Sequence, residues 1–338
     1  MRLLLFSVLF LALLGCRPDS PPDLEPDPPY VLDLPAGFPA PPIPEDNALT
    51  VSRLELGKHL FYDPILSRDS SLSCMSCHLP EAGFADHHPV SVGIEGRLGF
   101  RNSPTLTNVA YHPWFFKEGG SPSLEFQVLG PLENHVEMDI DAAVLNERLA
   151  TLSHYHPLAQ KAYGRDLDIY VLTRALASFQ RTLISGDAPY DAYRRGETRA
   201  LSAAQVRGMD LFFSDRTSCS ACHGGFDFST HGMENNGTER DYGADLGRFR
   251  ITLDSADIGK FKVPTLRNIA LTWPYMHDGH LPDLAAVIDH YNQGGQGHVN
   301  QSPLVRPLGL SEAEQADLVA FLESLTDQQF IENPAFRP

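Results

Sequence analysis

The sequence predicts a mostly α-helical protein of two domains that are related by internal duplication and contain little β structure. Three observations support this prediction. Apolar residues recur at helical spacing, short motifs recur in pairs along the chain, and the alternating pattern of strands is sparse. With 338 residues, the chain is long enough for two domains of about 100–200 residues each.

Helices are predicted at four places. The first begins near Thr50, and the second spans Asp166 to Ile184, where apolar residues recur every three or four positions. Two capping boxes, Ser202–Gln205 and Ser311–Glu314, mark the starts of two further helices. The helix that follows Ser311 is predicted to be the last, and the Gly- and Pro-rich stretches between helices are predicted to be loops.

The duplication is visible as paired segments. The pairs are residues 57–61 (GKHLF) with 208–212 (GMDLF), 104–110 (PTLTNVA) with 264–270 (PTLRNIA), and 115–119 (FFKEG) with 275–279 (YMHDG). Pro104 and Pro264 are 160 residues apart, as are Gly119 and Gly279. A constant offset of this kind is typical of two structurally related units.

Two Cys-x-x-Cys-His motifs carry the chemistry of the chain. This spacing is typical of c-type haem attachment, in which both thiols bond to the haem edge and the adjacent His ligates the iron. A zinc site or disulfides would also use paired cysteines, but a His after each second Cys favours haem. We therefore expect two cytochrome c-like domains that covalently bind two haem c groups, through Cys74, Cys77, His78, Cys219, Cys222 and His223.

The N-terminal segment predicts export. The chain has five cysteines, and the fifth, Cys16, ends an apolar stretch that follows Met1 and Arg2. The stretch is too short to span a bilayer. We expect residues 1–16 to be a lipoprotein signal peptide with a lipidated Cys16, which would place the protein in the periplasm or cell envelope, anchored to a membrane. An ordinary signal peptide or a buried Cys16 is the alternative.

Composition sets further limits. Residues 17–44 are rich in Pro and are predicted to form an extended tether. The folded part would divide into domains 45–190 and 191–338. The chain has 26 Lys and Arg against 43 Asp and Glu, a net charge of −17. This charge argues against nucleic-acid binding and suits a basic partner, such as a small electron-carrier cytochrome.

Several segments besides the haem motifs resemble the bacterial di-haem cytochrome c peroxidase and MauG family. The resemblance runs from about Leu54 to Leu325. The segments are residues 100–105 (FRNSPT), 130–138 (GPLENHVEM), 261–268 (FKVPTLRN) and 274–279 (PYMHDG). The resemblance implies that hydrogen peroxide reacts at the N-terminal haem domain and that the C-terminal haem domain transfers electrons.

The resemblance also implies site residues. Glu137 matches the acid/base group of the peroxide pocket, and Gln127 and Pro131 match its neighbours. Cleaving an O–O bond requires a group that takes a proton from one oxygen and delivers it to the other, which a carboxylate can do. A solvated surface carboxylate is the alternative for Glu137.

A calcium ion between the domains is implied in the same way. Asn102, Thr272 and Pro274 match positions that help to bind it, and amide and carbonyl oxygens are suitable calcium ligands. The alternative is a tight turn at residues 272–274.

The sequence departs from the usual peroxidase pattern at the first haem. The family places a His sixteen residues after the first haem His, and it ligates the iron in the resting enzyme. The chain has Ile94 there, which predicts an open sixth position. His87 and His88 lie nearby but are expected in an exposed loop.

Two further departures concern the second haem and the region between the haems. Tyr291 stands where peroxidases usually supply a Met ligand to the second iron, and Tyr at this position resembles MauG. Met276 and His277 are competing candidates for that ligand. Lys117 stands where the family usually has a Trp between the haems, and the only tryptophans are Trp114 and Trp273.

Three functions are consistent with these residues. The first is a di-haem peroxidase that reduces hydrogen peroxide with electrons from a periplasmic c-type cytochrome or a similar donor. The second is a MauG-like enzyme that uses peroxide to oxidise a side chain of a partner protein. The third is a non-catalytic di-haem electron carrier, which Glu137 and Ile94 argue against. A homodimer is also left open by the resemblance.

Overall fold

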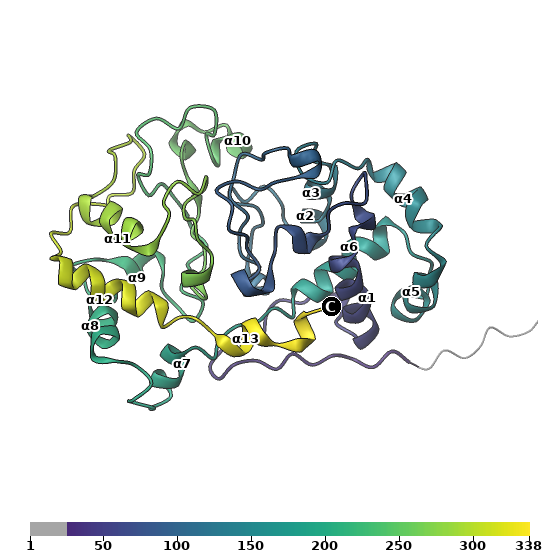
Figure 1. Ribbon diagram of the computed structural model, residues 1–338, viewed down its shortest axis with the longest axis horizontal. Coiled ribbons are helices and arrows are strands. Elements are labelled where there is room, and N and C mark those ends of the chain that lie inside the picture. Colours follow the sequence, from purple (N-terminus) through teal and green to yellow (C-terminus); the bar gives the residue numbers. More distant parts are fainter. Residues whose placement is uncertain (1–25) are drawn as a thin grey trace, which may run out of the picture.

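The computed structural model describes residues 26–338, and the chain over this range is mostly α-helical, as predicted. Two groups of helices form two halves, one built from α1 to α6 and the other from α7 to α12 (Figure 1). Two short antiparallel strands, β1 (Met233–Glu234) and β2 (Phe261–Lys262), pair in the second half. The predicted signal peptide, the lipidated Cys16 and residues 17–25 of the tether lie outside the described residues.

Short helices joined by 3₁₀ turns make up each half. The helices are α1 (Val51–Tyr62), α2 (Leu124–Gln127), α3 (Leu129–Glu133), α4 (Ala142–Ala150), α5 (His156–Tyr163), α6 (Ile169–Gln180), α7 (Pro189–Arg194), α8 (Ala203–Phe212), α9 (Cys219–Cys222), α10 (Phe249–Thr252), α11 (Leu284–Gln293), α12 (Glu312–Glu323) and α13 (Gln328–Glu332). Within residues 26–338, none of them has the length and apolar character needed to cross a bilayer.

The predicted helix starts agree with the structure to within a few residues. Both capping boxes are present at the N-termini of α8 and α12, where Ser202 and Ser311 accept backbone N–H groups. The helix predicted from Asp166 begins at Ile169 because the Asp168 side chain caps it by accepting the N–H of Val171. Local capping chemistry therefore sets these boundaries.

Each half contains one close helix crossing, and the two crossings are equivalent. α1 packs on α6, and α8 packs on α12. A Cβ atom added at Gly57 would lie 1.9 Å from the carbonyl oxygen of Ala175, and one added at Gly208 would lie 1.9 Å from that of Asp317. The glycine of the repeated GxxLF motif is therefore required where two helices touch.

Replacing Gly57 with Ala is expected to reduce the free energy of unfolding by about 3 kcal/mol, because the crossing helices must move apart. Chemical unfolding of the holoprotein would measure this loss. Glu55→Ala, at an exposed position of the same helix, is the matched control and should change stability little. Equal stability of the two variants would contradict the close crossing.

The C-terminal segment returns to the first half. Phe330 and Ile331 of α13, together with Phe336, belong to the hydrophobic core of that half. In Figure 1, α13 runs from the second half towards α1. The prediction that α12 is the last helix is wrong, because residues 328–332 form a further helix, α13. The domain boundary between residues 190 and 191 stays a prediction.

Residues 26–44 lie along the folded body. Pro29 forms a bridge with Thr50, and the Phe38 ring contacts Phe226 at a centroid distance of 4.7 Å. The Arg267 guanidinium lies over the Phe38 ring, 4.8 Å from its centroid. Residues 26–44 are extended, as predicted, but these contacts hold Pro29 and Phe38 against the protein, so this part of the segment does not act as a tether.

Candidate active site

The two motif histidines are held in the same way. His78 Nδ1 lies 2.9 Å from the carbonyl oxygen of Phe84, and His223 Nδ1 lies 3.1 Å from that of Phe228. A carbonyl can only accept, so each Nδ1 carries the proton and each Nε2 is left free to ligate a metal. Burial lowers the pKa of both histidines, which favours the neutral form that binds iron.

The four motif cysteines are free thiols in the structure. Burial raises the pKa of Cys74 and Cys77 to about 12, and it also raises the pKa of Cys219 and Cys222. Among the described residues, the cysteines are not gathered into a group with the geometry of a metal site. Neutral, unpaired thiols beside an available imidazole fit covalent haem attachment and do not fit a shared tetrathiolate zinc site.

A cavity of about 340 Å³ is lined by residues of both halves. Many of its lining residues are repeat partners, among them Pro104 and Pro264, Leu106 and Leu266, Phe115 and Tyr275, and Leu124 and Leu284. It also reaches Cys219, Cys222 and His223 of the second motif. The cavity lining includes the second haem motif but no residue of the first motif and not Glu137.

Glu137 lies beside the first haem motif. Burial raises the pKa of Glu137, and the Glu137 charge contributes to the raised pKa of Cys77. The Asn134 amide donates to Glu137 Oε1 at 2.7 Å. Gln127 lines the cavity, and the Pro131 carbonyl accepts from the N–H of Met138, next to Glu137 in the chain. Glu137 is half-buried, and its role as the acid/base group stays a prediction.

Ile94, which stands where the family has an iron-ligating His, lies against the backbone of Glu137. Ile94 is only 1% exposed, and its N–H donates to the Glu137 carbonyl at 2.9 Å. The His87 ring stacks on Trp273 at a centroid distance of 4.0 Å, whereas His88 is exposed. His88 is therefore exposed, as predicted, whereas His87 is only partly exposed because one face of its ring stacks on Trp273.

Tyr291 and Met276 lie close together in the second half. The Asn236 amide nitrogen is 3.4 Å from Tyr291 Oη and 3.2 Å from Met276 Sδ. Burial raises the pKa of Tyr291 to about 12, and the thiols of the second motif add to this shift. His277 instead stacks on Phe261 at a centroid distance of 4.4 Å. The choice of Tyr291 over Met276 as iron ligand stays a prediction.

The residues matched to a calcium site are brought together between the halves. Asn102 Nδ2 lies 3.3 Å from the Pro274 carbonyl oxygen, and Thr272 lines the same cavity. Lys117 Nζ lies 3.4 Å from Asn102 Oδ1. Burial lowers the pKa of Lys117 to about 8. An amine therefore already contacts the side-chain oxygen that a calcium ion would use.

Sequence reasoning did not single out Asn134 and Asn236. Their amides contact Glu137 in one half, and Tyr291 and Met276 in the other. Asn134 is three residues before Glu137, a short-range signal, but Asn236 is 55 residues from Tyr291, and only the fold joins them.

Two half-buried haem-attachment motifs in two related helical domains define a di-haem protein of the cytochrome c type. A family model described as di-haem cytochrome c peroxidase matches residues 51–199, and one described as cytochrome c matches residues 205–326. The chain is 39% identical over 294 residues to the methylamine utilization protein MauG of Methylorubrum extorquens, covering 84% of this chain and 81% of that protein.

Two further proteins are similar over most of their length. The cytochrome-c peroxidase IdrP1 of Pseudomonas sp. strain SCT is 36% identical over 326 residues, covering 86% of this chain and 85% of that protein. The crystal structure of a MauG-like protein associated with microbial copper homeostasis superposes with a TM-score of 0.86 at 34% identity, covering 91% of this chain and 98% of that one. The chain belongs to the di-haem cytochrome c peroxidase and MauG family, a family of oxidoreductases.

Proposed function

We propose that the protein reduces hydrogen peroxide to water, with electrons from a small c-type cytochrome or a similar donor. The observation that carries the proposal is the half-buried carboxylate of Glu137 beside the first haem motif. When bound there, haem supplies a redox-active iron to which peroxide can bind. His78 would hold that iron and His223 the iron of the second haem.

The residues around Glu137 suit proton transfer. The Asn134 amide holds Oε1, which leaves Oε2 free to accept a proton from one peroxide oxygen and deliver it to the other. A carboxylate with a raised pKa accepts a proton more readily near neutral pH than does an ordinary carboxylate exposed to water. Gln127 lines the cavity between the halves, and its place beside Glu137 rests on the resemblance to the family.

The test mixes the holoprotein with hydrogen peroxide and a pre-reduced c-type cytochrome and follows both absorption spectra. Rapid catalytic oxidation of the added cytochrome is expected. A lack of reaction with peroxide in every redox state would contradict the proposal and leave the electron-carrier function.

A MauG-like function is the second candidate, favoured by Ile94 and by Tyr291. In this function the oxidising equivalents of peroxide pass to a side chain of a partner protein. Its signature in the same experiment is a long-lived oxidised haem spectrum with little turnover of the added cytochrome. Lys117 lines the cavity between the halves, and a lysine cannot be oxidised as a Trp can, which weighs against this function.

We also propose that the protein is exported and anchored in the cell envelope through Cys16. Residues 1–16 have the pattern of a lipoprotein signal. Cell fractionation tests it: the wild type should be recovered with membranes and Cys16→Ser with the soluble envelope fraction. Equal distribution of the two proteins would contradict the anchor.

A calcium ion held by Asn102, Thr272 and Pro274 remains a proposal, and Lys117 is its competitor. Replacing Lys117 with Met is expected to raise calcium affinity about tenfold or more, because the variant removes a positive charge next to Asn102 Oδ1. Calorimetric titration with calcium after dialysis against a chelator measures the change. Equal affinities in wild type and variant would show that Lys117 does not compete for the site.

A further inference from the structure

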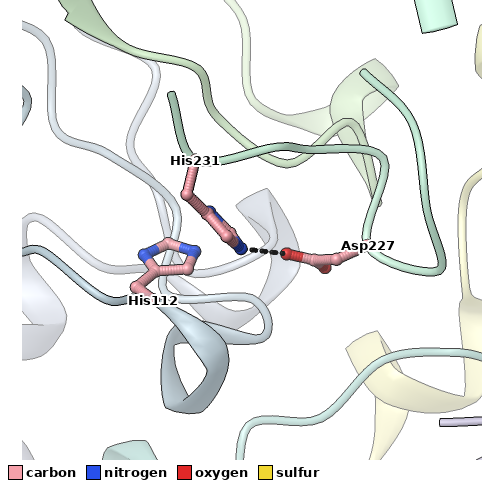
Figure 2. Close-up of side chains that lie close together, drawn as sticks. All are labelled: His112, Asp227 and His231. Carbon is pink, nitrogen blue, oxygen red and sulfur yellow. Dashed lines mark ion pairs between the residues drawn. The ribbon is translucent and has the colours of Figure 1, made fainter. Parts of the chain in front are cut away.

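Three side chains converge where the two halves meet. His112 follows the 3₁₀ turn Val109–Tyr111 of the first half, whereas Asp227 and His231 lie in the loop after the second haem motif. One potential metal-ligating atom from each residue lies within 4.8 Å of the others. Figure 2 shows the His231 ring between the His112 ring and the Asp227 carboxylate. These side chains belong to neither haem motif and do not contact Glu137, and His112 also lines the cavity between the halves.

Only one of the two carboxylate oxygens of Asp227 has hydrogen-bond partners. Its Oδ1 accepts from the Asn108 amide at 2.7 Å and from the Thr265 hydroxyl at 3.1 Å. Its Oδ2 is buried without a hydrogen-bond partner, and the residue is 1% exposed. Such a buried oxygen costs free energy unless a proton or a cation binds it.

The proton of neutral His231 lies on Nδ1, the ring nitrogen that faces Ser229. The Ser229 hydroxyl donates to the Val263 carbonyl at 2.7 Å, so its oxygen accepts from His231 Nδ1, 3.2 Å away. The lone pair of His231 Nε2 therefore faces Asp227 Oδ2 at 3.6 Å. Two acceptors face each other at this distance, which is close to the roughly 3.4 Å separation of two ligands on a tetrahedral zinc ion.

His112 supplies a third group. Its ring centroid lies 4.7 Å from that of His231, and its Nε2 is buried without a partner. Its Nδ1 lies 2.9 Å from Lys262 Nζ, which also donates to the Trp114 carbonyl. An ammonium that donates to Nδ1 keeps the proton of neutral His112 on Nε2, and an ion can bind Nε2 only after that proton has left. Lys262 therefore competes with an ion for His112.

We propose that His112, Asp227 and His231 bind one divalent first-row transition-metal ion at the junction of the two halves, in addition to the two haem irons. Two imidazoles and one carboxylate are a donor set that zinc and similar ions prefer, with water completing the shell. Because His112 comes from the first half and the other two ligands from the second, the ion cross-links the halves. Lys262 sets the affinity through its contact with His112.

The first test uses the holoprotein and zinc alone. After dialysis against a chelator, titration calorimetry with Zn²⁺ is expected to show one site per chain, and X-ray absorption at the zinc edge should show imidazole nitrogen ligands with a carboxylate oxygen. The zinc edge separates this ion from the haem irons. The absence of a stoichiometric site in the wild type would overturn the proposal.

Variants test the ligand assignment. His231→Gln should weaken zinc binding by more than the about 10–100-fold typical of losing an outer-shell partner. His154→Gln, at an exposed position of the first half, is the matched control and should leave zinc binding unchanged. Unchanged zinc affinity in His231→Gln, at full haem content, would overturn the assignment.

Lys262→Gln tests the competitor. It removes the ammonium next to His112 and leaves a side chain whose carbonyl can accept from Nδ1–H, so zinc binding should become tighter. A variant that binds zinc more weakly than the wild type would contradict the role given to His112. This variant stays informative even where a ligand substitution reduces folding yield.

Discussion

Replacing Glu137 with Gln is expected to lower peroxide turnover by about 10²–10⁴-fold, the usual contribution of a positioned acid/base group. Gln has nearly the same shape and can still contact Asn134, but it cannot carry the proton between the peroxide oxygens. Steady-state oxidation of a reduced c-type cytochrome measures the loss, and the haem absorption spectrum confirms that both haems are attached.

The control is Glu133→Gln, an exposed glutamate in α3. Its turnover should match that of the wild type. Equal turnover in Glu137→Gln and Glu133→Gln would remove Glu137 from the proposed proton transfer.

The pH profile offers an independent measurement. A proton acceptor must be ionised, so wild-type turnover should fall as the pH drops through the Glu137 pKa. Burial raises that pKa, so the fall should occur above the usual glutamate value of about 4.3. Glu137→Gln should lack this acidic limb.

Replacing Tyr291 with Phe is expected to raise the reduction potential of the second haem, by hundreds of millivolts within the span of about 0.8 V that axial ligands cover. A phenolate oxygen stabilises ferric iron, and its loss leaves Met276, which shares the Asn236 contact, as the nearby donor. Spectroelectrochemical titration of both haems gives the two potentials.

Met276→Leu is the matched variant for this prediction. With Tyr291 as the ligand, the potential of the second haem changes little in Met276→Leu. A large fall in potential in Met276→Leu, with no change in Tyr291→Phe, would assign the ligand to Met276 instead.

Local signals in the sequence account for much of the fold. The capping boxes at Ser202 and Ser311 depend on residues three positions apart, and the structure contains both. The repeated motifs predicted two related halves because each half needs the same glycine at its helix crossing and the same motif at its haem. The sequence did not predict the packing of residues 26–44 or of α13, since their positions depend on contacts with residues far away in the chain.

The candidate site also contains some residues that the sequence identifies and others that only the fold brings together. The haem-attachment motifs can be identified from spacing alone, whereas Ile94 stands out only through the resemblance to the family, which has a His at that position. Asn236 could not be, since it is 55 residues from Tyr291. The cluster of His112, Asp227 and His231 could not be either, since His112 is far in the chain from the other two. Lys117 could be recognised as a departure from the family pattern, but its contact with Asn102 required the fold.

The packing of α13 has a consequence for how the protein matures. The rings of Phe330 and Phe336 lie 5.7 Å and 6.3 Å from that of Phe84, whose carbonyl holds His78 in position. Residues near the C-terminus, which the ribosome adds last, thus support the iron ligand of the N-terminal half. The N-terminal half cannot complete its core until residues 328–336 are present, so it is not an independent unit that could be produced without them.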